Sequence, residues 1–435
     1  MSLLARLSDE YRATPPSARL KAALLFNGVR YHPALAEAAD WAFPNFLQYH
    51  LPPGEPAHRG SRLVDMPYLL RMADDTQVRL RIKPDSPFSV VPHENPLGFA
   101  VFENDTYITS TTFEPRLPWA GLLTADGTPM RATGLSQHGD MLVLNVAPGC
   151  EYFVVPTESG RSRNLSCSFC LYGLPDKRMD PLGQSLFVKE VPESTLARVA
   201  EACSRHDTHA RHLYLVGGSM LDMAQEGERF VQIARYLAER GLTERYYVTC
   251  GSGALPRAQM LALKDAGVRG ACFNLEVWDP EQFARVCPGK NQIVGRDRWI
   301  ASLEEAVDVF GPQEVMSAFV GGVELDGNGA MTDVAAALAS NVEAGEYLIP
   351  RGVQAVYSLH WKMTGKHRGE EPVYSLDFFL RLNEQLAEVR RRHNRPINQE
   401  HFCRRCAYMQ LEPDYDYAPT PALPPHDHLG AFAIA

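Results

Sequence analysis

The spacing of apolar and polar residues changes near residue 135. Before that point, a helical stripe over 18–26 is followed by alternating runs at 78–82 and 107–112, which are typical of short strands. This mixture of helix and alternating strands predicts an N-terminal α+β domain over residues 1–135 that caps the rest of the chain.

A second domain is predicted over residues 136–395, where short apolar runs alternate with amphipathic stretches. The apolar runs predict buried strands at 141–146, 212–216, 246–249, 270–275, 315–320 and 353–358. Between them, one helical stripe is expected to end at Gly241, another ends at Gly311, and a third begins after Ser375. Repeated strand–helix units imply parallel strands with right-handed crossovers. The predicted fold is therefore α/β, with six strands in an open sheet or a partial (β/α)6 barrel.

Composition and charge limit the classes of partner and the cellular location that the sequence allows. Among 435 residues, 45% are apolar and 22% are charged, with a net charge of −9. The acidic balance argues against nucleic acid or an anionic membrane as partner, because both require clustered Lys and Arg. The N-terminus becomes charged too early for a secretory signal, and no apolar run reaches the ~18–20 residues that span a bilayer. We therefore expect a cytoplasmic protein.

Nine cysteines in a cytoplasmic chain are expected to be thiols or metal ligands. Cys203, Cys250, Cys272 and Cys287 fall on predicted helices, strands or their ends, and most of these four are expected to be buried apolar residues.

The run Cys167-Ser-Phe-Cys170 carries the strongest chemical signal in the chain. It follows the first predicted strand after a long loop, so it falls at the carboxyl edge of the sheet, where ligands of such folds bind. A Cys-x-x-Cys pair in an intracellular chain is more often a metal or redox site than a disulfide. Cys150 directly follows the same strand, and sixteen residues separate it from Cys167. A loop of this length can fold back, since closure entropy grows slowly with length.

These residues, with Phe169 before the second Cys and Tyr172-Gly173 after it, resemble the end of the radical S-adenosylmethionine (SAM) signature. The family motif has its first Cys closer upstream than Cys150. The resemblance implies that Cys150, Cys167 and Cys170 hold three irons of a four-iron, four-sulfur cluster, and that SAM binds the open fourth iron.

Further segments resemble the family in the same order along the chain. Gly217-Gly218-Ser219 follows the second strand, Asn274 and Glu276 end the fourth, and Glu324 ends the fifth. The order, with these segments at successive strand ends, is joint support that no single segment provides. The resemblance implies cofactor contacts from Phe169, Gly217, Gly218, Ser219, Asn274, Glu276, Glu324 and Tyr357.

The implied activity is reductive cleavage of SAM to methionine and a 5′-deoxyadenosyl radical, which abstracts hydrogen from a small metabolite. An electron donor such as flavodoxin or ferredoxin would be needed. Transfer of an aminocarboxypropyl group from SAM at the same cluster is an alternative. Five residues after the fourth and sixth strands are compatible with an anionic substrate: Arg285, Lys290, His360, Trp361 and Lys362.

Residues 396–435 are expected to form a short irregular tail that contains Cys403 and Cys406 and a Pro-rich end from Pro419 to Pro425. The two cysteines could belong to a second metal site or close the barrel mouth. They could instead join Cys167 and Cys170 in a four-Cys zinc site of a metabolite-binding barrel. An ordinary barrel lyase with unrelated cysteines is a third hypothesis.

Overall fold

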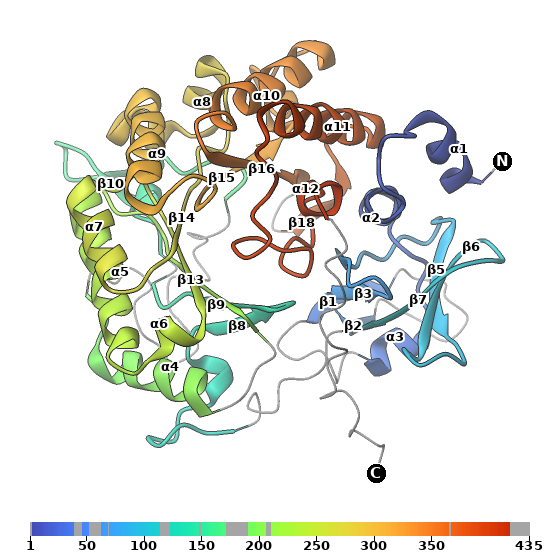
Figure 1. Ribbon diagram of the computed structural model, residues 1–435, viewed down its shortest axis with the longest axis horizontal. Helices are drawn as coiled ribbons and strands as arrows, with labels where there is room; N and C mark the ends of the chain where they lie inside the picture. The colour runs from blue at the N-terminus through green and yellow to red at the C-terminus, as the bar shows by residue number, and fades with distance from the viewer. Residues whose placement is uncertain are drawn as a thin grey trace.

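A curled sheet of seven strands forms the centre of the protein (Figure 1). The computed structural model describes residues 2–38, 46–51, 62–67, 69–113, 122–147, 149–170, 190–205, 210–364 and 367–417. The strand order is β16-β15-β14-β13-β12-β9-β8. Six neighbouring strands are parallel: β9 (Met141–Leu144), β12 (His212–Val216), β13 (Tyr247–Ser252), β14 (Gly270–Phe273), β15 (Val315–Gly321) and β16 (Val353–Leu359). The six predicted strands are thus confirmed, as is the partial barrel. The antiparallel edge strand β8 (Leu135–His138) was not predicted.

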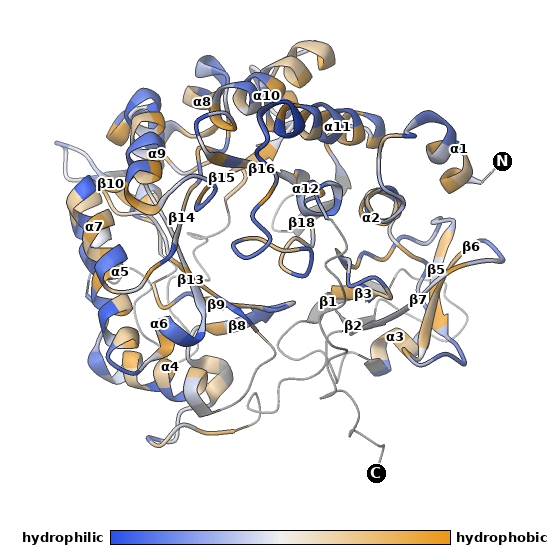
Figure 2. Cartoon of the chain, viewed as in Figure 1, coloured by the Kyte–Doolittle hydropathy of each residue, from blue (hydrophilic) through white to orange (hydrophobic). Residues whose placement is uncertain are grey.

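Helices cover the outer face of this half-barrel (Figure 1). Figure 2 shows that these helices carry both hydrophobic and hydrophilic residues, as expected when one side of each helix packs on the sheet. On α5, for example, the buried side chains include Phe230, Ile233 and Leu237. The helices are α4 (Glu193–Arg205), α5 (Met223–Ala238), α6 (Leu242–Arg245), α7 (Arg257–Asp265), α8 (Pro280–Val286), α9 (Arg296–Phe310), α10 (Val334–Leu348) and α11 (Leu376–His393).

Local sequence signals set most helix ends. The side chain of Ser375 accepts a hydrogen bond from the amide of Phe378 and begins α11, and Gly311 follows the last residue of α9, as predicted. The predicted C-cap at Gly241 is wrong. Helix α5 already ends at Ala238, and Gly241 instead adopts a left-handed conformation (φ 70°) that starts the short helix α6.

Within its described residues, the N-terminal region contains a five-stranded antiparallel sheet, three helices and a separate strand pair. Its elements are α1 (Leu3–Glu10), α2 (Pro16–Asn27), α3 (Pro33–Ala38), β1 (Phe46–Leu51), β2 (Arg62–Pro67), β3 (Leu69–Met72), β4 (Gln77–Arg79), β5 (Phe88–Pro92), β6 (Phe99–Glu103) and β7 (Thr106–Phe113). The α+β character of this region agrees with the sequence. The domain boundaries at 135 and 395 stay predictions.

Residues 396–417, here called the C-terminal segment, form a buried and mostly irregular stretch. Short elements near this end of the chain are β17 (Trp361–Thr364), β18 (His367–Pro372) and α12 (Glu412–Tyr415). The segment packs its apolar side chains against inward-facing residues of the half-barrel: Ile397, Phe402, Cys403, Cys406 and Ala407 against Cys272, Met316 and Val356. The predicted irregularity is confirmed as far as Tyr417, and the Pro-rich end from Pro419 lies outside the described residues.

A buried ion-pair network joins the C-terminal segment to the N-terminal region. The Asp414 carboxylate receives hydrogen bonds from Lys21 Nζ (2.8 Å) and Arg404 Nε (2.9 Å). Arg404 also reaches the Asp74 carboxylate at 2.9 Å. In Figure 1, α12 correspondingly lies between α2 and β16. None of the helices in the described ranges combines the length and apolarity needed to cross a membrane.

Candidate active site

A cavity of about 260 Å³ opens where the parallel strands end. Its walls come from the loop after β9, from the ends of β12 and β13, and from the residues that follow β12 and β14, so the carboxyl edge of the sheet positions it. The lining residues are Cys150, Tyr152, Phe153, Ser166, Cys167, Phe169, Cys170, Tyr214, Val216, Gly217, Gly218, Ser219, Gly251, Ser252, Asn274, Glu276, Lys290 and Trp299.

Cys150, Cys167 and Cys170 meet in this cavity, as the sequence led us to expect. Cys150 and Cys167 are buried, whereas Cys170 is partly exposed. The ligands of a single ion would lie within about 4.8 Å of one another. Among the described residues, these three thiols do not form such a group. Wider spacing is what a cubane needs, because each thiolate binds a different iron. Three thiols on the wall of one cavity supply the kind of soft ligand that a four-iron cluster uses.

The loop that carries these thiols is held on two sides. On one side, the amide of Glu151 donates to the carbonyl of Ser219 (2.8 Å), which places Cys150 against the loop after β12. On the other, the amide of Ser168 donates to the carbonyl of Val286 (2.9 Å), at the end of α8. The sixteen residues before Cys167 thus fold back so that both parts of the loop reach one cavity.

The glycine pair after β12 allows the two loops to touch. The amide of Gly218 donates to the carbonyl of Ala147 (2.8 Å), and its own carbonyl accepts from Arg229 Nη2 (2.8 Å). A Cβ atom at Gly218 would lie 2.1 Å from the carbonyl oxygen of Gly149 and 2.5 Å from the amide nitrogen of Cys150. Only glycine at position 218 leaves room for this approach.

Glu276 and Lys290 form a buried ion pair on the opposite wall. Lys290 Nζ donates to Glu276 Oε1 (2.9 Å) and to the carbonyl of Asn274, and it lies 4.5 Å from the centre of the Trp299 ring. Burial opposes the charge on Lys290, but Glu276 and Cys167 raise its pKa above the ordinary value. Glu276 adopts a left-handed backbone (φ 75°), a strained conformation that is more common at functional sites than elsewhere.

Cys287 is a member of this site that the sequence analysis missed. It is fully buried at the end of α8, as predicted for an apolar thiol, but it hydrogen-bonds to Cys167. This bond, opposed by burial and assisted by Lys290, lowers the pKa of Cys167 and favours its thiolate. Burial raises the pKa of Cys150 to about 12, so Cys150 would ionise only with a metal as partner.

Six of the eight predicted SAM contacts line the cavity; Glu324 and Tyr357 do not. Tyr357 is fully buried, and its hydroxyl donates to the carbonyl of Asn341 on α10 (2.6 Å). Glu324 Oε1 accepts from the Asn341 side chain (3.0 Å). On β16 it is Val356 that faces the interior, and adjacent residues of a strand point to opposite faces. The geometry therefore gives no support to SAM contacts from Glu324 and Tyr357, which stay predictions.

The cations that suggested an anionic substrate have partners within the protein. Arg285 donates to backbone carbonyls of residues 323, 324 and 326, and Lys290 pairs with Glu276. His360 Nε2 lies 3.0 Å from Asp326 Oδ2. The side chains of Trp361 and Lys362, together with Tyr172 and Gly173, lie outside the described residues.

Cys403 and Cys406 lie at the other end of the half-barrel. Both contact Asp140, which directly precedes β9, whereas the cavity lies beyond the last residue of that strand. The five residues of the neighbouring β12 separate the two ends by about 13 Å. The four-Cys site with Cys167 and Cys170 is therefore excluded, and the pair does not close the barrel mouth.

The structure thus combines parallel strands curled into a half-barrel with three thiols and a glycine pair at the carboxyl edge. This arrangement is the one that the resemblance to the radical SAM superfamily implies.

Comparisons with known proteins give distant matches. The chain is 19% identical over 311 residues to bacteriochlorophyllide c C-7(1)-hydroxylase of Chlorobaculum limnaeum, covering 68% of this chain and 72% of that protein. A radical SAM methyltransferase from Sphaerobacter thermophilus is 14% identical, with coverage of 71% and 76% and a TM-score of 0.39. Methylornithine synthase (PylB) is 14% identical with a TM-score of 0.33, and the match spans 55% of this chain and 62% of that one. No family model matches the chain.

Proposed function

We propose that this enzyme cleaves SAM reductively at a four-iron, four-sulfur cluster held by Cys150, Cys167 and Cys170. The observation that supports the proposal most strongly is the meeting of these three thiols in one cavity, although they come from separate parts of a long loop. A cluster held by these thiols would supply the one electron whose transfer to SAM gives methionine and a 5′-deoxyadenosyl radical. The radical then takes a hydrogen atom from a small-molecule substrate and becomes 5′-deoxyadenosine.

The chain's own residues would hold SAM beside the three thiols. Phe169 and the segment Gly217 to Ser219 line one side, and Asn274 and Glu276 line the other. The Glu276 carboxylate is fixed by Lys290, so it offers a preorganised acceptor for a cationic or hydroxyl group. The enclosing walls keep water from the radical, which suppresses side reactions.

The similarity to a hydroxylase is compatible with a reaction that begins at a carbon–hydrogen bond. An external one-electron donor of the flavodoxin or ferredoxin type would restore the reduced state. Because Arg285, Lys290 and His360 have partners within the protein, they give no support to an anionic substrate.

Anaerobic incubation with SAM and dithionite, followed by chromatography, tests the proposal. We expect 5′-deoxyadenosine and methionine in equal amounts from the wild type and from Cys203→Ala, a variant at a buried cysteine of α4 outside the cavity. Cys167→Ala should give neither product. A wild-type enzyme with a full complement of iron that releases no deoxyadenosine would refute the proposal, and release of methylthioadenosine would identify aminocarboxypropyl transfer instead.

A further inference from the structure

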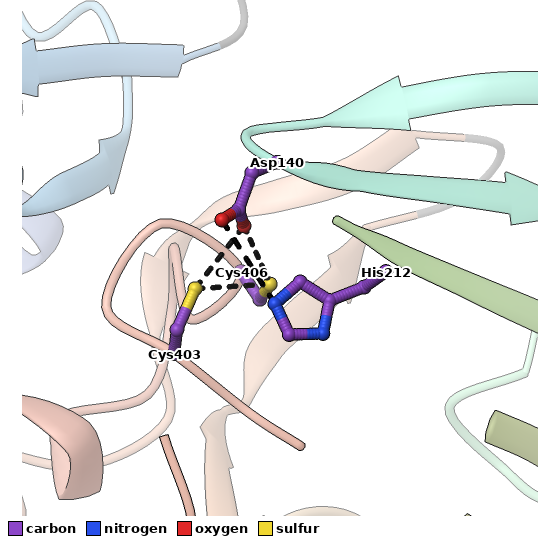
Figure 3. Close-up of side chains that lie close together, drawn as sticks. All are labelled: Asp140, His212, Cys403 and Cys406. Carbon is purple, nitrogen blue, oxygen red and sulfur yellow. Dashed lines mark hydrogen bonds and ion pairs between the residues drawn. The ribbon is translucent and has the colours of Figure 1, made fainter. Parts of the chain in front are cut away.

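Four side chains with metal-binding atoms converge at the amino end of the half-barrel (Figure 3). They are Asp140 before β9, His212 at the start of β12, and Cys403 and Cys406 in the C-terminal segment. All four are buried, and their ligand atoms lie within 4.8 Å of one another. We call this group the base site.

Distances within the base site are close to those of a tetrahedral metal centre. Asp140 Oδ1 lies 3.1 Å from Cys403 Sγ and 3.0 Å from Cys406 Sγ, and the two sulfurs are 3.3 Å apart. His212 Nε2 lies 3.8 Å from Asp140 Oδ2. Ligands at ordinary zinc bond lengths stand roughly 3.3–3.8 Å apart at the corners of a tetrahedron. Small side-chain movements would therefore complete the coordination.

Two backbone segments lie in direct contact at the base site. Gly139 adopts a left-handed conformation (φ 63°), and a Cβ atom there would overlap the carbonyl oxygen of Arg405. The β8–β9 turn thus contacts the loop between the two cysteines directly. That loop is itself a tight turn, in which the amide of Cys406 donates to the carbonyl of Cys403 (3.0 Å). The backbone on both sides of the site is therefore closely packed.

We propose that the base site binds one zinc ion through Asp140, His212, Cys403 and Cys406. Two thiolates, one imidazole and one carboxylate form a complete tetrahedral zinc set, whereas Ca²⁺ and Mg²⁺ require oxygen ligands. With all four positions taken by the protein, the site has no place for a substrate, so the zinc is structural.

Two features of the residues support this assignment. The buried His212 side chain contacts Cys403 and Asp140, both members of the base site, as expected for a ligand of the same ion. Arg211 Nε lies 3.3 Å from Asp140 Oδ2 and would offset the net negative charge of a zinc with two thiolates and a carboxylate.

The structural consequence is that zinc would fasten the C-terminal segment to the base of the half-barrel. This segment supplies Phe402 and Ala407 to the apolar core inside the curl. It also carries Asp414, which binds Lys21 of the N-terminal region at 2.8 Å. One ion at the base site would therefore help to join three parts of the fold: the half-barrel, the C-terminal segment and the N-terminal region.

Element analysis of the anaerobically purified full-length protein tests this inference. We expect about one zinc per chain in addition to iron, in the wild type and in Cys203→Ser. The double variant Cys403→Ser/Cys406→Ser should retain its iron and lose at least nine-tenths of its zinc. Cys167→Ala should do the reverse, which separates the base site from the proposed SAM cluster.

Cobalt replacement provides a readout that does not depend on the folding of a variant. Wild-type protein stripped of zinc by a chelator should take up one Co²⁺ and show thiolate-to-cobalt charge transfer with tetrahedral d–d bands. After chelation, trypsin should cut the C-terminal segment faster, and added zinc should reverse the change. Protein that holds no zinc and gives no thiolate–cobalt bands, or that contains a Cys403–Cys406 disulfide, would overturn the proposal.

Discussion

Gly218→Ala tests the role of Cys150, because Gly218 packs against the backbone that precedes this cysteine. The new Cβ atom would lie 2.1 Å from the carbonyl oxygen of Gly149, whereas ordinary contacts begin at 3.4 Å. The backbone just before Cys150 must therefore retreat by more than an ångström. Overpacking of this kind costs about 1–3 kcal/mol in the free energy of unfolding. The displacement also moves the Cys150 thiol away from Cys167 and Cys170, so we expect loss of most of the iron.

Iron content and thermal unfolding, measured on the same samples, separate the local effect from a general loss of stability. Gly241→Ala is the matched control, because Gly241 also has a left-handed conformation (φ 70°), but a Cβ atom added there would meet no other atom within 4 Å. Its backbone strain costs about 1–2 kcal/mol. We expect Gly241→Ala to unfold at a lower temperature with its iron intact. Full iron and unchanged SAM cleavage in Gly218→Ala would refute the packing argument.

Three further substitutions probe other parts of the fold. Burial raises the pKa of Glu324 to about 7 from an ordinary 4.5, so its stabilising effect is complete below pH 4.5 and is lost as the pH rises through 7. This amounts to about 3 kcal/mol at most, and unfolding of Glu324→Gln at pH 5 and pH 8 should lack that dependence while SAM cleavage persists. Lys290→Met leaves the Glu276 carboxylate buried without its cation, which should cost about 3–5 kcal/mol in denaturant unfolding, and an unchanged midpoint would contradict the pairing. Cys287→Ala removes a hydrogen bond to Cys167, so a potentiometric titration should show a cluster with a lower reduction potential, and an unshifted potential would argue against that bond.

Much of the fold could be predicted because parallel strands buried on both faces appear as short apolar runs. All six such runs became strands of the half-barrel. The same property explains why the sequence placed Tyr357 at the cavity. When both faces of a strand are apolar, the sequence does not reveal which residues point inward, and β16 turns Val356 to the interior and Tyr357 to α10.

The candidate site was predictable where its residues follow strand ends and not where they come together through tertiary packing. Cys150, Cys167 and Gly218 were placed at one edge from topology alone, and the structure brings them together. Lys290 reaches the cavity, and Cys287 reaches Cys167, from the residues that follow α8, which carry no local signal of their position. The base site is the extreme case, since Asp140 and Cys403 are 263 residues apart.

The central claim is that Cys150, rather than the neighbouring Cys287, is the third cluster ligand. Iron and sulfide determination on anaerobically reconstituted Cys150→Ala and Cys287→Ala tests it most directly. We expect Cys287→Ala to keep about four irons per chain, and Cys150→Ala to lose the cluster. Full iron in Cys150→Ala together with loss in Cys287→Ala would contradict the account and assign the third thiolate to the end of α8.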